Sequence, residues 1–230
     1  IRALDASMNR AIVVRHGDPL DIVPRFAQEV GADKVFISAD FAPYGSQRDA
    51  EVASRLAAMK VELVAVGSPY AVNPGTVRKD DGKPYAVFTP FSRGWVRHGW
   101  PAPLSAPTSM NLRGAPDIKC DGIPADPELA AELPVAGEPA AWDRWEHFAS
   151  DALSRYKEER NNPDRDGSSK LSAYLRFGVL HPRQLLAELR PDTNHDVYRS
   201  ELGWREFYAD VLHHQPSTTW KNLQPKMGSM

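Results

Sequence analysis

A predicted helix near residue 200 has an acid, a base and three aromatic side chains on one face. Glu201, Trp204, Arg205 and Tyr208 recur at intervals of three and four residues, and Tyr198 lies about one turn earlier. Residues at these intervals share one stripe of an α-helix. Such a stripe could form the wall of a pocket for a flat aromatic ligand with polar edges. It could equally be a solvated face with a Glu–Arg pair and an indole packed against a linker, and the spacing leaves both interpretations open.

A second candidate site lies in the segment from Asp166 to Leu175, where a turn leads into an amphipathic helix that Gly178 ends. Hydroxyl groups and free backbone N–H groups at such a helix start suit a phosphate. The plainer interpretation is that Ser168 or Ser169 is only the N-cap, since serine is a favoured cap residue. A further helix is expected to start at His181-Pro182, with proline in its first position.

A third pattern, from Lys83 to Trp95, joins a strand-like piece to an aromatic piece that contains prolines. We expect it to pack the following linker against the first domain.

The elements that must position these residues begin with a β-α-β-α-β rhythm over residues 11–66. The expected strands are 11–14, 35–38 and 63–66, and the expected helices are 20–30 and 48–59. This alternation predicts a parallel sheet. Loops at Gly17-Asp18, Asp40 and 67–69 follow the strands, at the edge where open α/β sheets favour ligands.

The rest of the chain divides into a linker and a helical region. Residues 100–139 are rich in proline, alanine and glycine without a sustained period, which is typical of a long surface connection. Helical patterns follow at 142–160, 169–177, 182–189 and 197–213. We therefore predict an α/β plus all-α fold: a Rossmann-like domain with a parallel sheet at 1–99, a linker at 100–139 and a helical domain at 140–230.

Composition excludes several classes of protein. The chain has 28 basic and 30 acidic residues, so its net charge gives no support for a nucleic-acid partner, and any such site must be a local patch. No apolar stretch is long enough to span a membrane and no secretory signal is visible, so we expect a cytoplasmic protein without a membrane partner. A single cysteine, Cys120, allows no internal disulfide and no cysteine zinc site, and we expect an inert loop residue and no metal. The glycine and histidine motifs of dinucleotide dehydrogenases, P-loop NTPases and zincin proteases are absent.

The three segments together resemble the photolyase and cryptochrome family, in the family's order. Residues 84–95 match PYxVFTPFxxxW, residues 156–183 match YxxxRxxPxxxGTSxLSxYLxFGxxSPR, and residues 201–208 match ELxWREFY. Asp18-Pro19, Pro43-Tyr44 and Arg48-Asp49 extend the resemblance over almost the whole chain. An accidental match of this length is improbable, so the plainer interpretations above lose most of their weight.

The resemblance implies FAD as cofactor and assigns a role to particular residues. Positions that hold the FAD pyrophosphate and ribityl chain match Tyr156, Ser168, Ser169, Leu171 and Ser172, with Lys170 among them. Tyr198, Glu201 and Arg205 match the flavin pocket. Glu201 and Trp204 are the expected catalytic residues, the first bonding to a flipped base and the second stacking on it. Candidate DNA-phosphate contacts, or equally ordinary solvated charges, are Arg160, Lys170, Arg176 and Arg183.

The function implied is that of a class I DNA photolyase, a carbon-carbon lyase that repairs cyclobutane pyrimidine dimers by light-driven electron transfer from reduced FAD. The alternatives are a cryptochrome-type light sensor and a nucleotide-binding α/β module with a helical interaction domain. Glu201 followed by Trp204 favours repair. The expected partner is ultraviolet-damaged DNA, bound by a monomer.

Departures from the family pattern are few. Ser168 stands where threonine is usual, and His181 replaces a common serine cap. Residues 44–49 lack the Asn-Glu pair of folate-binding members, which weakly favours a deazaflavin antenna or none and leaves its type undecided. The chain also lacks the family's opening strand and much of the C-terminal half of its helical domain. We therefore expect a fragment that binds FAD weakly or not at all.

Overall fold

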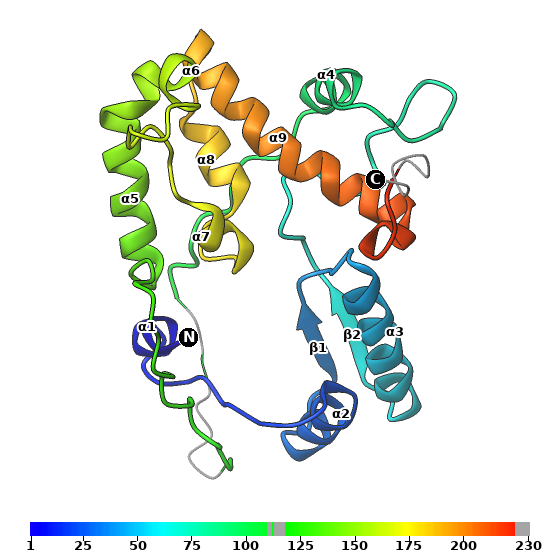
Figure 1. Cartoon of the computed structure of the whole chain (residues 1–230). Coiled ribbons are helices and arrows are strands. Elements are labelled where there is room, and N and C mark those ends of the chain that lie inside the picture. The colour runs from blue at the N-terminus through cyan, green and yellow to red at the C-terminus, as the bar shows by residue number, and fades with distance from the viewer. Residues whose placement is uncertain (110–111, 113–117, 224–230) are drawn as a thin grey trace.

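The structure, a computed structural model, describes residues 1–109, 112 and 118–223. A small α/β part lies at one end and a set of helices at the other, which confirms the predicted fold class (Figure 1). In the α/β part, β1 (Lys34–Ile37) pairs in parallel with β2 (Glu62–Ala65). Two helices, α2 (Pro19–Glu29) and α3 (Pro43–Ala58), pack against each other, and α3 also packs on β2. The helices and the parallel pair thus occur where the alternating pattern predicted them.

Local sequence explains where these two helices begin. The Asp18 side chain accepts a hydrogen bond from the Leu20 N–H at 2.9 Å and so caps α2. Proline occupies the first position of both α2 and α3, where its missing N–H has no helical partner in any case. The small core between helices and sheet consists of Ala27, Val52, Leu56 and Val61.

The predicted strand at residues 11–14 was wrong. This segment follows α1 (Arg2–Ser7) as irregular chain. Ala11 and Ile12 donate to residues of α1 and its end, and Val14 bonds to a distant loop instead of to β1. The Val14 carbonyl accepts from the Asp121 N–H at 2.8 Å, and the Val14 N–H donates to the Cys120 sulfur at 3.3 Å. Strand formation requires a partner strand in register, and none of the described residues offers one to this segment.

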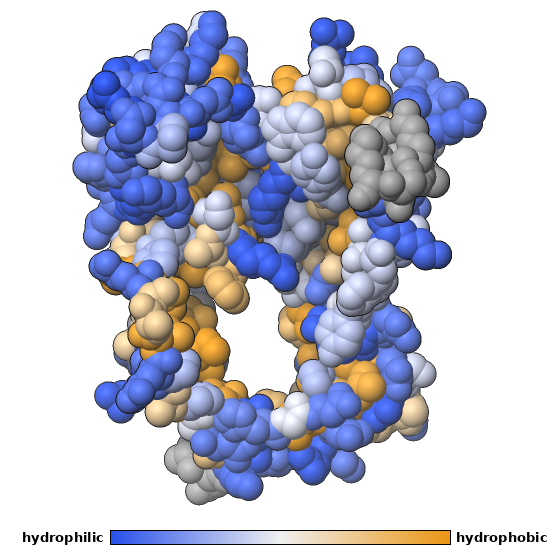
Figure 2. Space-filling view, in the orientation of Figure 1, coloured by the Kyte–Doolittle hydropathy of each residue, from blue (hydrophilic) through white to orange (hydrophobic). Residues whose placement is uncertain are grey.

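Figure 2 shows an opening through the molecule, between the α/β part and the helical part.

The helical part surrounds a larger, aromatic-rich core. Its α-helices are α4 (Phe88–His98), α5 (Glu138–Ser150), α6 (Tyr156–Glu159), α7 (Ser172–Arg176), α8 (Pro182–Glu188) and α9 (Thr193–His214). Two short 3-10 helices, η1 (Ala152–Arg155) and η2 (Pro216–Thr219), flank α6 and α9. The long helix α9 contacts α4, α6 and both 3-10 helices, so it is the element on which the others assemble (Figure 1).

The segment 83–95 corrects a second prediction. Its aromatic piece forms helix α4, in which Pro90 lies in the first turn, where proline is tolerated. Phe91 and Trp95 are buried in the core of the helical part, and α4 packs on α9. The segment therefore belongs to the helical core instead of packing the linker against the first domain.

Other helix bounds differ from the pattern for identifiable reasons. The helix expected over 142–160 ends at Ser150, because Asp151 leaves helical geometry at φ −127° and ψ −76°, and resumes as η1 and α6. Helix α9 begins before residue 197 because Asp192 caps it, accepting from Asn194 and His195 N–H groups. His181 caps α8 as expected, with Gln184 completing the capping box. Within the described ranges, no helix has the length and apolarity needed to cross a membrane.

Candidate functional site

A cluster of buried aromatic rings joins α5, α6 and α9. Tyr156 meets Tyr198 edge-on, with ring centroids 5.3 Å apart, and both rings contact Phe148. Trp145 lies 5.6 Å from Tyr198. Burial raises the pKa of both tyrosines, so their hydroxyls stay protonated at neutral pH and act as hydrogen-bond donors.

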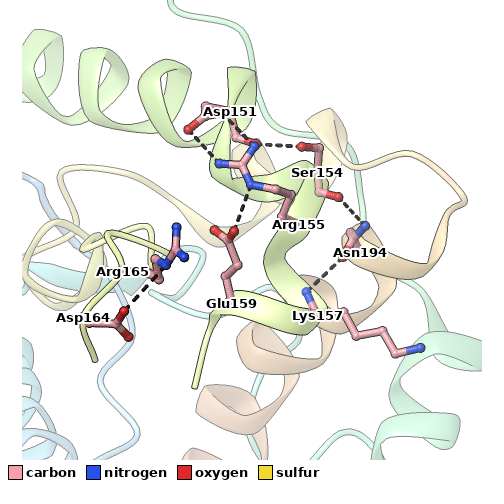
Figure 3. A network of polar contacts seen from close by, with 8 residues as sticks. All are labelled: Asp151, Ser154, Arg155, Lys157, Glu159, Asp164, Arg165 and Asn194. Carbon is pink, nitrogen blue, oxygen red and sulfur yellow. Dashed lines mark hydrogen bonds and ion pairs between the residues drawn. The ribbon is translucent and has the colours of Figure 1, made fainter. Parts of the chain in front are cut away.

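A polar network fixes the backbone on both sides of Tyr156 (Figure 3). The Asn194 side chain donates to the Ser154 carbonyl at 2.6 Å and accepts from the Lys157 N–H at 2.9 Å. Arg155 bridges the carboxylates of Asp151 and Glu159. Because Asn194 belongs to the first turn of α9, this network holds α6, and with it Tyr156, against α9.

The side chains of Arg160 and Glu201 form an ion pair that joins the end of α6 to α9. The Arg160 guanidinium also lies 6.0 Å from the centre of the Tyr156 ring. Both charged side chains are about one third exposed. The i,i+4 pair that the helix spacing allowed, between Glu201 and Arg205, is therefore not the pair that forms. Glu201 faces the aromatic cluster with a surface arginine as its partner.

The segment 166–172 packs against the same cluster. The Tyr198 hydroxyl donates to Ser169 Oγ at 3.1 Å, and Leu171 is buried. Lys170 pairs with Asp166 at 2.8 Å and has a positive φ of 53°. A hydrogen bond from Lys170 lowers the pKa of the Asp166 carboxyl, and the charge of a nearby arginine adds to the effect.

The plainer interpretation, that Ser168 or Ser169 only caps the next helix, was wrong. Helix α7 starts at Ser172, and Leu171 occupies the cap position without a side-chain hydrogen bond. The left-handed backbone at Lys170 separates the two serines from the helix start, so their hydroxyls are not used as caps.

Trp204 lies one helical turn beyond Glu201, in a stack of aromatic rings. Its indole is parallel to Phe88 of α4, with centroids 3.6 Å apart and planes 11° apart. Tyr208, which is exposed, lies 5.6 Å away on the same helix. The indole is half-buried, and Phe88 covers one of its faces.

Arg205 and Arg183 face a different part of the molecule, the loop that follows β2. Arg205 lies 4.6 Å from the centre of the Tyr70 ring, and Arg183 donates to the Ala71 carbonyl at 2.9 Å. His181 contacts the Ser68 carbonyl at 2.9 Å, and burial lowers the pKa of its imidazole. Arg183 is half-buried, whereas Arg176 is exposed. These contacts give Arg183 a structural role besides its predicted contact with DNA.

Two buried acids of α9 were missed from the sequence. Glu206 accepts from the Ala71 and Val72 N–H groups, each at 3.0 Å, and Asp210 accepts from the Gly75 N–H at 2.7 Å. Both are buried, and burial raises the pKa of Glu206 to about 7, although its backbone bonds oppose the rise. Their spacing of four residues, on a helix face that also bears apolar residues, is the signal that could have revealed them.

The structure thus gathers some of the predicted site residues and separates others. Contacts link Tyr156, Arg160, Ser169, Tyr198 and Glu201 into one group. Trp204 is the next turn of the same helix, whereas Arg205 and Arg183 bind the loop after β2. Chemically, the first group offers hydroxyl donors, an ion pair and aromatic surface.

Comparisons with known proteins agree on one family. The family model for DNA photolyase matches residues 1–108. A deoxyribodipyrimidine photo-lyase of Synechococcus is 31% identical over 232 residues, covering 90% of this chain and 47% of that protein. The chain spans about half the length of the curated relatives it matches.

Solved structures give the same result for the fold. A bacterial class III photolyase from Agrobacterium tumefaciens has a TM-score of 0.80 at 25% identity, over 99% of this chain and 51% of that one. A Synechocystis cryptochrome has a TM-score of 0.81 at 20% identity, over 92% of this chain and 48% of that one, which is a likeness of fold alone.

Proposed function

Because the chain belongs to the DNA photolyase family, we propose that it serves in light-driven repair of cyclobutane pyrimidine dimers in DNA, as a class I photolyase. The observation that carries this proposal is the match to photo-lyases along most of the chain. The resemblance of residues 201–208 to the family motif ELxWREFY supports it. The proposed partner is ultraviolet-damaged DNA, and the proposed location is the cytoplasm.

FAD is the proposed cofactor, and the donors present suit its diphosphate. Segment 166–172 offers serine hydroxyls and the Lys170 ammonium group, and in the described chain the backbone N–H groups of 167–171 donate to no other backbone carbonyl. Phosphate oxygens accept bonds from such donors. Tyr156, Ser168, Ser169, Lys170, Leu171 and Ser172 would hold the cofactor on this side, and Tyr198, Glu201 and Arg205 would line the flavin. Bound and reduced, FAD supplies the electron that light transfers to the dimer.

The chain's own residues would receive and orient the dimer. A flipped dimer leaves the base stack more readily than an intact pair. Trp204 offers a stacking surface, one face of which Phe88 already supports. Glu201 would accept a hydrogen bond from the base edge, and Arg160, its present partner, would then be free to bind a phosphate.

The remaining basic residues differ in how readily they could reach DNA. Lys170 and Arg176 are exposed, which supports a phosphate contact, whereas Arg183 is half-buried and bound to Ala71. Any antenna chromophore, of deazaflavin or folate type, is proposed to bind in the α/β part or where it meets the helical part. Residues 44–49 lack the Asn-Glu pair of folate-binding members, which favours a deazaflavin or no antenna.

The cryptochrome-type sensor remains the second candidate, because a cryptochrome shares the fold. Repair and sensing differ in what happens to the dimer. The test uses the protein in the longest form that its gene encodes, reduced and loaded with FAD, and an oligonucleotide containing one thymine dimer. We expect loss of the dimer in blue light and not in darkness.

Two variants test the assignment of residues. Glu201→Ala and Trp204→Ala should each lower the repair rate at least tenfold at equal FAD content. Trp220→Ala is the matched control, because that indole is 90% exposed and lies just after η2, beyond the C-terminal end of α9. An intact dimer after illumination of the reduced, loaded protein would reject repair and favour the sensor.

A further inference from the structure

One arginine that no motif singled out holds the segment 166–170 in place. Arg144, on α5, donates from Nε to the Ser169 carbonyl at 2.9 Å and from Nη2 to the Ser168 carbonyl at 2.8 Å. The same guanidinium meets the Asp166 carboxylate at 3.3 Å. Its side chain is only 21% exposed, so these bonds are partly shielded from water.

A second contact holds the segment from the other side. Gly167 is buried against the end of α6, where an added Cβ would lie 3.0 Å from the Glu159 carbonyl oxygen. A larger residue at this position would require the Glu159 backbone to give by a few tenths of an ångström. Arg144 and Glu159 therefore confine the segment between α5 and α6.

In this segment, the direction of each carbonyl group decides where the following N–H group points. Two consecutive carbonyls, those of Ser168 and Ser169, point to Arg144. Because the peptide unit is planar and trans, the N–H that follows each of these carbonyls points away from Arg144. Successive N–H groups that point the same way are the usual basis of an anion-binding concavity.

We propose that Arg144 is a positioning residue for the cofactor diphosphate: by binding the carbonyls of Ser168 and Ser169, it turns the following N–H groups toward the phosphates. This inference rests on the proposed function, since it takes the segment as the place where FAD is held. Arg144 itself touches the carbonyl side and not the ligand.

Local charge is consistent with this role. Asp166 would repel a diphosphate, but Arg144 and Lys170 both pair with it. One carboxylate with two cations leaves a net positive charge beside the N–H groups.

The test uses the 230-residue chain, inorganic pyrophosphate as the probe, and amide NMR shifts of residues 167–172 as the readout. Arg144→Met removes all the bonds, and Arg144→Lys keeps the charge without the planar fork that reaches both carbonyls. Arg25→Met is the matched control, because Arg25 is an exposed arginine of α2, in the α/β part.

We expect pyrophosphate to shift these amides in the unchanged chain and in Arg25→Met with equal affinity. Arg144→Met should weaken pyrophosphate binding at least tenfold. The affinity of Arg144→Lys should lie between those of the unchanged chain and Arg144→Met. Equal affinity in Arg144→Lys and the unchanged chain would show that charge alone suffices, and equal affinity in Arg144→Met would show that the arginine is not needed. Either result overturns the inference, as does an unchanged chain whose amides at 167–172 do not shift.

These outcomes are independent of the repair assay. Dimer loss in light without a pyrophosphate response would reject the role of Arg144 and leave repair supported. A pyrophosphate response that depends on Arg144, without dimer loss, would support the positioning role and reject repair.

Discussion

Two glutamates of α9, Glu201 and Glu206, occupy opposite environments. The Glu201 side chain is 38% exposed and pairs with Arg160, whose own side chain is 32% exposed. The Glu206 side chain is 3% exposed and accepts from two backbone N–H groups of the loop after β2. Both acids belong to the same short motif, so residue type and spacing do not distinguish them.

The difference separates an acid that can change partners from one that cannot. A surface arginine can leave Glu201 for a phosphate at small cost in free energy, because water solvates both charges. The buried N–H groups of Ala71 and Val72 cannot leave Glu206 without losing the acceptor that they have among the described residues. Glu201 is thus suited to binding, and Glu206 fastens the loop that connects the α/β part to the helical part.

The largest expected effect is on stability, from Glu206→Ala. The change leaves the buried Ala71 and Val72 N–H groups without an acceptor, which should lower the free energy of unfolding by roughly 2–4 kcal/mol. Urea unfolding at pH 4.5, where the Glu206 contribution is full, followed by tryptophan fluorescence measures it. Glu206→Gln, which keeps one strong acceptor, should lose about half as much, and a loss below about 1 kcal/mol for the alanine variant would contradict the fastening role.

The pH dependence of stability is a second test of how the buried Glu206 differs from the partly exposed Glu201. Burial raises the pKa of Glu206 from 4.5 to about 7, so the folded state binds its proton more tightly than the unfolded state. Its contribution to stability is therefore full below pH 4.5 and is lost as the pH rises to about 7, by up to about 3 kcal/mol.

The comparison of the unchanged chain with Glu206→Gln isolates this effect. His181 acts in the opposite direction, since burial lowers its pKa and stability falls as the pH drops below its ordinary value of 6.5. It remains in both proteins and cancels in the difference. Urea unfolding at several pH values between 4.5 and 7.5 should show the unchanged chain losing stability relative to Glu206→Gln as the pH rises, until the variant is the more stable protein near pH 7. A constant difference would mean that Glu206 titrates normally.

Part of the fold could be predicted because its signals are local. The helices expected at 20–30 and 48–59 occur as α2 and α3, since amphipathic spacing, proline and an Asp cap act within a few residues. The strand expected at 11–14 failed because pairing depends on a distant partner. Helix α4 was not predicted, because the packing of its aromatic residues on α9 is a tertiary contact without a local signal.

The candidate site divides in the same way. Helical spacing correctly placed Glu201, Trp204 and Arg205 along one helix. It could not show that Glu201 pairs with Arg160, 41 residues away, or that Glu206 bonds to residues 134 and 135 positions earlier. Such partners depend on how α6 and the loop after β2 pack on α9, and one sequence contains no local signal for them.

The smallest expected effect on stability is that of Glu201→Ala, the counterpart of the first variant. An ion pair between two partly exposed side chains contributes less than about 1 kcal/mol, because both charges remain solvated when it breaks. Urea unfolding of Glu201→Ala, Arg160→Ala and the double variant gives the coupling between them. We expect a coupling below about 1 kcal/mol. It should weaken further in roughly 0.5 M NaCl, because salt screens the interaction between surface charges. A coupling as large as the loss in Glu206→Ala would mean that Glu201 is also a structural fastener, and its exchange of Arg160 for a base would then be too unfavourable for the proposed role.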